Sequence, residues 1–358
     1  MKILHTESSN GWGGQEMRIL KEALGLRQRG HEIIFAVVKG GKLVDYARKE
    51  GFTVYEIDFH RRSILSALIK LVQILRRHSI EIVNTHSSLD SWIGGIAARL
   101  VRCKVVRTRH LSTPVKGGLN ALMLYRGLAD FVVTTSSGII PTLARQARIP
   151  LTRLRCVPTG VAPIAVDPEE VQAFRARLGV NEGDILVGTV CVVRSWKGIQ
   201  DLVEAARLLK HLPHIKWVIV GGGYLDQYRH LVDSSLPVTF TGHVENPFSA
   251  IAALDIFTLL STAHEGISQA SLQAAYLQKP LITTTVGGLP EVCLEGVTGL
   301  LVPPFSPAKI AEAVLKLAED PLLRKTFGEA AHSLVKEKFM LHHTLEEMEK
   351  VFLGCKIG

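Results

Sequence analysis

Short runs of apolar residues recur along the whole chain, and between them apolar positions repeat every three to four residues. The runs have the length of β-strands and the periodic stretches the length of helices. In the first half we predict strands at Lys2–Thr6, Glu32–Val37, Thr53–Ile57, Glu81–Asn84, Lys104–Thr108, Phe131–Thr135 and Leu154–Val157. In the second half we predict strands at Ile185–Val192, Ile215–Val220, Val238–Thr241, Ile256–Leu260, Leu281–Thr284 and Gly299–Val302, and helices such as Ile199–Lys210 and Ser268–Leu277.

This alternation predicts an α/β fold. Continuous apolar strands separated by helices form parallel sheets that are covered on both faces. The alternation pauses at Val157–Val171, a proline-containing stretch without helical period that we interpret as a linker. We therefore expect two doubly wound, Rossmann-like domains facing each other across a cleft, at 1–160 and 161–340, with 341–358 as a last helix that is a candidate for crossing back to the first domain. Ligands of such sheets bind beyond the carboxyl ends of the strands.

Composition narrows the class of protein. The chain has 358 residues, 47% of them hydrophobic and 21% charged, which is typical of compact globular domains. Five cysteines without a C-x-x-C pair indicate neither a disulfide framework nor a zinc site. No apolar run reaches the length of a bilayer span, and the first predicted strand begins at Lys2, so we expect a cytoplasmic protein.

A formal net charge of +9 favours anionic partners. One basic segment is Phe59–Ser79, in which Arg61, Arg62, Arg76 and Arg77 flank an apolar stretch. Basic amphipathic helices can lie on anionic bilayers, which would place the protein peripherally on the inner face of the cytoplasmic membrane. An ordinary sheet-covering helix with charged ends explains the pattern equally well. Nucleic acid is disfavoured as a partner, because no aromatic and basic stacking surface accompanies the charge.

Glycine turns follow several predicted strands. Gly13 and Gly14 lie between the first strand and a helix, where a backbone can approach an anionic ligand closely. The dinucleotide-binding pattern G-x-G-x-x-G fails there, because its last position is Glu16. A second turn contains Gly221, Gly222 and Gly223. Each turn is also consistent with tight packing alone.

Two segments of the second domain have the chemistry of a diphosphate site. Arg194 and Lys197 follow a strand, and two cations at its carboxyl end suit a diphosphate, although solvated loop charges are the alternative. In "HEGISQASLQ" the N–H groups of Gly266, Ile267 and Ser268 begin a predicted helix, whose dipole favours phosphate.

The same segment contains two polar side chains suited to a sugar. Glu265 would reach sugar hydroxyls beyond the phosphates, or else merely cap the helix, and Gln273 would contact a ribose. In the first domain, His86 and His110 end two strands and are candidates for the acceptor side, although a lone histidine is more often structural.

Taken together, several motifs resemble the retaining glycosyltransferase family 4, which has the GT-B fold. They are "GGQE", "RSWKG", "GGGY", "HEGIS" with Gln273, "VGGLPEV" and "GVTGLLVPP", in the family's order and spacing. The resemblance implies transfer of a sugar from a nucleotide diphosphate with retained configuration and without metal or other cofactor. The donor would sit mostly in the C-terminal domain and the acceptor against the N-terminal one.

The resemblance also assigns roles to residues. Arg194 and Lys197 would neutralise the leaving diphosphate, Glu265 would contact the donor sugar, and His110 would be the active-site histidine, with His86 as its helper. Gln273 departs from the family, which usually has the second Glu of an E-x7-E motif there. The donor-binding set that we predict is Gly13, Gly14, Arg194, Lys197, Gly222, Glu265, Gly266, Ile267, Ser268 and Gln273.

We therefore predict a glycosyltransferase that uses a UDP-, GDP- or ADP-sugar and a glycan or glycolipid acceptor. Synthesis of lipopolysaccharide or another cell-envelope polysaccharide is the expected setting. Two alternatives stay open at this point. One is a GT-B epimerase that acts on a nucleotide sugar without an acceptor, and the other is a non-catalytic nucleotide-sugar-binding protein, which Gln273 favours.

Overall fold

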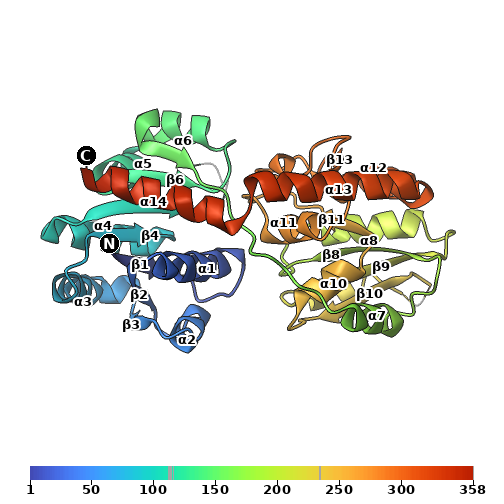
Figure 1. The fold of residues 1–358 in the computed structure, drawn as a ribbon, viewed down its shortest axis with the longest axis horizontal. Helices are drawn as coiled ribbons and strands as arrows, with labels where there is room; N and C mark the ends of the chain where they lie inside the picture. Colours follow the sequence, from blue (N-terminus) through green and yellow to red (C-terminus); the bar gives the residue numbers. More distant parts are fainter. Residues whose placement is uncertain (112–114, 116, 234, 358) are drawn as a thin grey trace. The chain divides into compact units, whose positions relative to one another are not determined.

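The computed structural model describes residues 1–111, 115, 117–233 and 235–357 and, of residues 61 and 357, the backbone alone. This part of the chain divides into two compact units (Figure 1). The first unit is Met1–Thr159 together with Leu341–Gly358, and the second unit is Gly160–Met340. The last helix, drawn in red in Figure 1, thus belongs with the beginning of the chain.

The first unit is built on a parallel sheet. Its strands are β1 (Lys2–Glu7), β2 (Glu32–Val38), β3 (Thr53–Ile57), β4 (Ile82–Thr85), β5 (Lys104–Arg109), β6 (Phe131–Thr134) and β7 (Leu154–Cys156). Its helices are α1 (Gly14–Gln28), α2 (Lys42–Lys49), α3 (Ile64–Arg77), α4 (Ser88–Val101), α5 (Leu119–Leu122), α6 (Ile140–Ala147) and α14 (Leu341–Ile357), with the short helical segments η1 (Arg61–Ser63), η2 (Met123–Leu128) and η3 (Leu151–Arg153).

The strand order of this sheet creates a switch point. Within the described residues the order is β3-β2-β1-β4-β5-β6-β7, and every pair is parallel. The winding reverses between β1 and β4, where the connections leave on opposite faces and open a crevice at the carboxyl ends. The crevice of the first unit is therefore expected next to Glu7, His86 and His110, which end or follow β1, β4 and β5.

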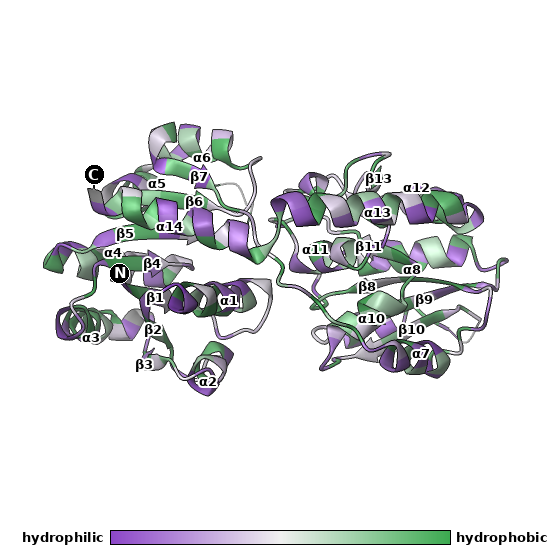
Figure 2. Ribbon diagram, viewed as in Figure 1, coloured by the Kyte–Doolittle hydropathy of each residue, from purple (hydrophilic) through white to green (hydrophobic). Residues whose placement is uncertain are grey.

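Helix α14 completes the core of the first unit. It packs on α1 and β5, and its Met348 and Phe352 side chains are fully buried in the same apolar cluster as β1 and β2. Gly25 of α1 makes this contact close, because a Cβ atom there would lie 2.3 Å from a methyl group of Leu345. In Figure 2 α14 is green and purple in turn, as expected for a helix with one face in the core and one in water.

The second unit repeats the same design. Its strands are β8 (Ile185–Val190), β9 (Ile215–Val220), β10 (Val238–Gly242), β11 (Ile256–Leu259), β12 (Leu281–Thr284) and β13 (Gly299–Val302). Its helices are α7 (Pro168–Arg177), α8 (Ile199–Leu208), α9 (Asp226–Arg229), α10 (Pro247–Ala253), α11 (Gln269–Tyr276), α12 (Pro307–Glu319) and α13 (Pro321–Lys338), with η4 (Leu289–Glu291). Among the described residues the parallel order is β10-β9-β8-β11-β12-β13, so the switch point lies between β8 and β11.

The predicted α/β class with two doubly wound sheets is confirmed, and each predicted strand is present with ends that differ by a few residues at most. One prediction was wrong. The stretch Val157–Val171 is not free of helix, because α7 begins inside it at Pro168. Asp167 caps this helix by accepting from Glu169 N–H at 2.9 Å, and Pro168 occupies the first helical position, where a missing N–H costs nothing.

The basic segment of the sequence forms α3 and the turn before it. Ala67, Leu71, Ile74 and Leu75 bury one face in the core, as a sheet-covering helix requires. Leu65 and Ile69, one turn apart on this helix, are 69% and 51% exposed. No helix in the described part of the chain has the length and the apolar character that a membrane span needs.

Candidate active site

In the second unit, a cationic and an anionic side chain meet at the carboxyl ends of β8 and β11. Lys197, in the loop after β8, forms an ion pair with Oε1 of Glu265, in the loop after β11. Ser261 donates to the same oxygen at 2.7 Å. Because the side chains of Lys197 and Glu265 are only 16% and 8% exposed, water screens their attraction weakly. The structure thus brings together two residues that the sequence places 68 positions apart.

Arg194 belongs to the same loop as Lys197. Its carbonyl oxygen accepts from Lys197 N–H at 3.0 Å, and its guanidinium carbon lies 5.5 Å from the ring centre of Trp196. The predicted pair of cations is therefore carried by one tight turn at the end of β8. This cation–π contact with Trp196 orients the Arg194 side chain without consuming its N–H donors.

Glycines allow the loops of this site to touch. Gly198 has a φ of 66°, and a Cβ atom there would lie 2.0 Å from the carbonyl oxygen of Leu260. Gly287 has a φ of 59°, and its Cβ would lie 1.9 Å from the carbonyl oxygen of Glu265. The backbone next to Lys197 and the backbone of Glu265 itself are therefore held by close contacts that only glycine permits.

The turn at Gly221, Gly222 and Gly223 serves the packing of the β8 loop. Cβ atoms at Gly221 and Gly223 would lie 1.9 Å and 2.3 Å from the carbonyl oxygens of Cys191 and Val193. The carbonyl oxygen of Gly222 accepts from Val193 N–H at 2.8 Å. Loop packing therefore accounts for Gly221 and Gly223, and a donor contact of Gly222 stays a prediction.

The segment before α11 differs from what the sequence predicts. The helix begins at Gln269, not at Ser268, because Ser268 is its N-cap and accepts from Ser271 N–H at 3.4 Å. This contact makes Ser268, and not Glu265, the helix cap. The side chain of Ile267 is 5% exposed and belongs to the apolar core, so only its backbone could face a ligand.

Gln273 is buried on α11 and already has a partner. Its Nε2 donates to Oε1 of Gln269, one turn earlier, at 3.4 Å, and Nε2 of Gln269 donates to the Gly160 carbonyl oxygen at 2.9 Å. Both side chains are less than 10% exposed. Gln269 was not predicted from the sequence, although two glutamines four positions apart on a helix face indicate such a pair.

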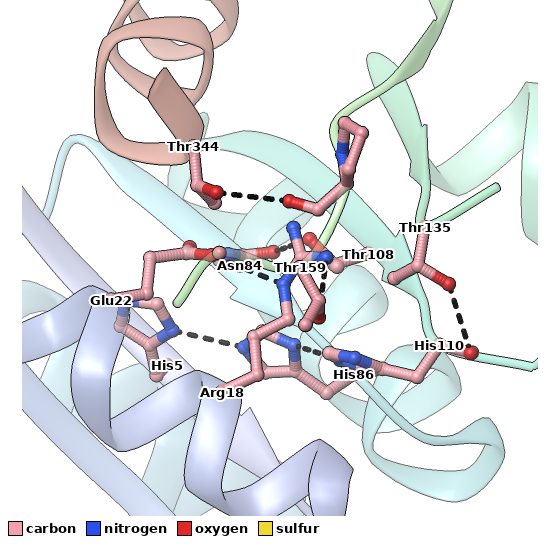
Figure 3. A network of polar contacts seen from close by, with 12 residues as sticks. His5, Arg18, Glu22, Asn84, His86, Thr108, His110, Thr135, Thr159 and Thr344 are labelled. Carbon is pink, nitrogen blue, oxygen red and sulfur yellow. Dashed lines mark hydrogen bonds and ion pairs between the residues drawn. The ribbon is translucent and has the colours of Figure 1, made fainter. Parts of the chain in front are cut away.

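In the first unit, three histidines form a hydrogen-bonded chain (Figure 3). Nδ1 of His5, in β1, lies 2.9 Å from Nε2 of His86, and Nδ1 of His86 lies 3.0 Å from Nε2 of His110. The predicted neighbours His86 and His110 are therefore in direct contact. His5 was not predicted, although it stands in the first strand at a position that a buried parallel sheet would otherwise give to an apolar residue.

Burial keeps these imidazoles neutral. It lowers the pKa of His5 to about 3 and holds the pKa values of His86 and His110 well below the ordinary range. The positive charge of Arg18, on α1, lowers the pKa of His110 further. Arg18 is itself buried, contacts Glu22 at 3.5 Å and donates to Thr159 at 3.2 Å (Figure 3). The pair was not predicted, although an Arg and a Glu four residues apart on a helix indicate such an ion pair.

Gly13 and Gly14 lie in the first unit, at the start of α1. Gly13 N–H donates to the Glu16 carboxylate at 2.9 Å, so Glu16 takes a backbone donor that we predicted for a ligand. Glu7, at the end of β1, is buried beside them. It accepts from Ser9 N–H at 2.7 Å, and burial followed by the negative charge of Asp90 raises its pKa to about 8.

Two family models cover most of the chain. The model described as Glycosyltransferase Family 4 matches residues 12–165, and the one described as Glycosyl transferases group 1 matches residues 170–334. The chain belongs to glycosyltransferase family 4. The first match includes Gly13, His86 and His110, and the second includes Lys197 and Glu265.

Relatives of this family 4 glycosyltransferase match it over nearly its full length. It is 25% identical over 350 residues to the capsular polysaccharide biosynthesis glycosyltransferase CapM of Staphylococcus aureus, with 91% of each chain covered. It is 24% identical over 348 residues to the N-acetyl-alpha-D-glucosaminyl L-malate synthase of Bacillus anthracis, with 91% of this chain and 90% of that one covered.

A solved structure places this glycosyltransferase in the GT-B fold. Anabaena HepE in complex with UDP superposes with a TM-score of 0.87 at 21% identity, covering 99% of this chain and 100% of that chain. The family models confirm the predicted enzyme class, and this superposition confirms the predicted fold. The roles of individual residues stay predictions.

Proposed function

We propose that this glycosyltransferase moves a sugar, with retained anomeric configuration and without a metal ion, from a nucleotide diphosphate to a glycan or lipid-linked acceptor. The second unit would bind the donor, and the first unit would bind the acceptor. The observation that carries the proposal is the contact between Lys197 and Glu265, beside Arg194, at the switch point of the second sheet.

The groups at this switch point match the parts of a nucleotide sugar. Arg194 and Lys197 supply positive charge for the diphosphate, and their effect grows as the bond to the sugar breaks and negative charge develops. Two cations held by a tight turn provide this stabilisation without a metal. Glu265 offers its second carboxylate oxygen to sugar hydroxyls, because no hydrogen bond or ion pair in the described part of the chain ends on Oε2.

The nucleotide end of the donor is expected near α11. The N–H groups of Gly266, Ile267 and Ser268 precede the helix, where the dipole favours phosphate. Gln273 would meet the ribose with an amide, which has a single accepting atom and two donating hydrogens. HepE was solved with UDP, which supports a UDP-sugar, and GDP- or ADP-sugars are the other candidates.

A cell-envelope polysaccharide is the acceptor class that the relatives support. CapM takes its name from capsular polysaccharide synthesis. The lipopolysaccharide role expected from the sequence is a more specific form of the same proposal. Envelope glycans are built at membranes, and the exposed Leu65 and Ile69 on the basic helix α3 support a peripheral contact with an anionic surface.

The test is a donor screen with the full chain. Purified protein is incubated with UDP-, GDP-, ADP- and dTDP-sugars in excess EDTA, with and without an acceptor glycan fraction, and release of nucleoside diphosphate is measured. We expect release with one donor class that rises with acceptor, and a product whose anomeric proton coupling equals that of the donor. An inverted product would contradict retention, and loss of activity in EDTA that Mg²⁺ restores would contradict metal independence.

The same screen separates the two alternatives. An epimerase would convert the donor into an isomeric sugar nucleotide without acceptor, which the NMR spectrum of the donor-only sample shows. A non-catalytic binding protein would shift its thermal unfolding with a nucleotide sugar and release nothing. Gln273 in place of the family's glutamate is the observation that favours this second alternative.

A further inference from the structure

The three histidines of the first unit run from the core to the carboxyl edge of the sheet. His5 is fully buried in β1, His86 is 4% exposed after β4, and His110 is only partly buried after β5. The rings of His5 and His86 are stacked in parallel, with their centres 5.2 Å apart. Figure 3 shows the two nitrogen-to-nitrogen contacts in one line, with His110 at its outer end.

A chain of neutral imidazoles has a direction. Burial disfavours the charged form of all three rings, so each one has a single N–H and a single lone pair. If His5 donates from Nδ1, His86 must donate from Nδ1 to Nε2 of His110. If instead His110 donates from Nε2, His86 must donate from Nε2 to His5. No third arrangement fills both contacts.

The buried Nε2 atom of His5, at the inner end of the histidine chain, decides between these two arrangements. Nε2 of His5 is buried and has no hydrogen-bond partner in the described part of the chain. If the hydrogen bonds run inward, with His110 donating to His86 and His86 to His5, an N–H group without an acceptor remains at Nε2 of His5. If they run outward, from His5 to His110, a lone pair remains there. Buried N–H groups without a partner are the rarer and costlier of the two.

The surroundings of His5 favour a lone pair as well. Its partner in the β1–β4 register is Asn84, whose amide nitrogen is buried without an acceptor, while its carbonyl oxygen accepts from Thr108 at 2.8 Å. Its partner in the β1–β2 register is Phe35, whose ring is stacked on it at 5.6 Å and has no hydrogen-bond acceptor atom. Neither of these two residues accepts a hydrogen bond from Nε2 of His5.

We infer that His5 and His86 hold His110 in the Nδ1–H tautomer, so that His110 presents a hydrogen-bond donor to its ligand. Nε2 of His110 is occupied by His86, and no hydrogen bond within the described residues ends at its Nδ1. This inference rests on the proposed function, in which His110 contacts a sugar. His110 would then donate to a sugar oxygen instead of removing a proton from the acceptor. His5 and His86 are positioning residues, because they act through His110.

The tautomer can be read directly by NMR. In the full chain with ¹⁵N-labelled histidine, the two-bond ¹H–¹⁵N correlation pattern distinguishes Nδ1–H from Nε2–H rings. The His110 signals are identified by their loss in His110→Gln. We expect the Nδ1–H pattern for His110 between pH 6 and 8. An Nε2–H pattern in the wild type would overturn the inference.

A matched pair of variants at His5 tests the positioning. His5→Gln keeps a side-chain N–H that can donate to His86, whereas His5→Phe keeps the ring shape and removes the donor. We expect His5→Phe to give a mixture of His110 tautomers and a kcat that falls about tenfold, with nucleotide affinity unchanged. His5→Gln should keep both the tautomer and the turnover.

These readouts separate the inference from the proposed function. If no donor is turned over, the proposed function fails, while the NMR pattern still decides whether the chain of histidines fixes the tautomer. If His5→Phe folds and its His110 keeps the wild-type pattern, the inference fails whatever the activity. Equal kcat in the two variants would likewise overturn the positioning role.

Discussion

At the scale of single residues, Glu265 has two carboxylate oxygens in different situations. Oε1 accepts from Ser261 and pairs with Lys197, whereas no hydrogen bond or ion pair in the described part of the chain ends on Oε2. Since Ser268 caps α11, the helix does not need Glu265 as its cap. A carboxylate that is fixed by one oxygen and open at the other is suited to hold a ligand hydroxyl.

We predict that Glu265→Gln weakens binding of the intact donor and leaves the nucleoside diphosphate nearly unaffected. The substitution keeps the size of the side chain and removes a charged acceptor, which is typically worth about 1.5–3 kcal/mol in a hydrogen bond. It also releases Lys197, which stays available to the diphosphate. Isothermal titration with both ligands is the measurement. Equal weakening of the two would show that Glu265 supports the fold of the loop and does not bind sugar.

At the scale of elements, the sequence was informative about strands and poor about contacts between them. Apolar runs such as Ile215–Val220 are long and β-rich, so their position in the chain is encoded locally. The partnership of His5 with His86 depends instead on the register of β1 against β4, which no local pattern contains. Helix α7 was missed because Asp167 and Pro168 are residues that turns and helix starts share.

Helix α3 carries a prediction at this scale. One face of this helix is buried in the core, yet Leu65 and Ile69 remain exposed, and the exposed Arg62 precedes the helix while Arg76 and Arg77 end it. We expect the protein to bind vesicles of anionic lipid, to bind neutral vesicles weakly, and to dissociate as salt is raised, because the basic residues add about 1 kcal/mol each near such a surface.

The matched variant is Leu65→Ser with Ile69→Ser, and the control is Leu208→Ser, which removes a 52% exposed leucine from α8 of the second unit. Vesicle co-sedimentation should show roughly tenfold weaker binding for the double variant, from the lost apolar area, and no change for the control. Equal binding by all three proteins would mean that α3 only covers the sheet.

At the scale of the whole molecule, buried titratable groups are distributed unevenly between the two units. The first unit contains the buried residues His5, His86, Glu7 and Asp90 and the buried Arg18–Glu22 pair. These groups change the stability of one unit with pH and leave the other largely alone. A single melting temperature would combine the stabilities of the two units, so the stability of the first unit must be measured with a probe inside that unit.

His5 and Glu7 change the stability of the first unit in opposite directions as pH changes. The folded pKa of His5 is about 3, against 6.5 in the unfolded chain, so the unfolded state gains protons first and stability is lost as pH falls from about 6.5 towards 3. The folded pKa of Glu7 is about 8, against 4.5 unfolded, so the folded state keeps a proton that the unfolded state has released. Stability is therefore lost as pH rises from about 4.5 to 8.

We predict that Glu7→Gln removes the alkaline part of this dependence. Glutamine resembles the protonated acid, and Gln15, which donates to Glu7, can turn its amide to donate and accept in the new arrangement. The gain over the wild type should grow by at most about 1.4 kcal/mol per pH unit between pH 6 and 8 and then level off. Hydrogen exchange of peptides from β1 and β4 measures it, with the exposed Glu50→Gln as control. A difference that is constant with pH would show that Glu7 is ionised in the folded protein, in spite of its burial beside Asp90.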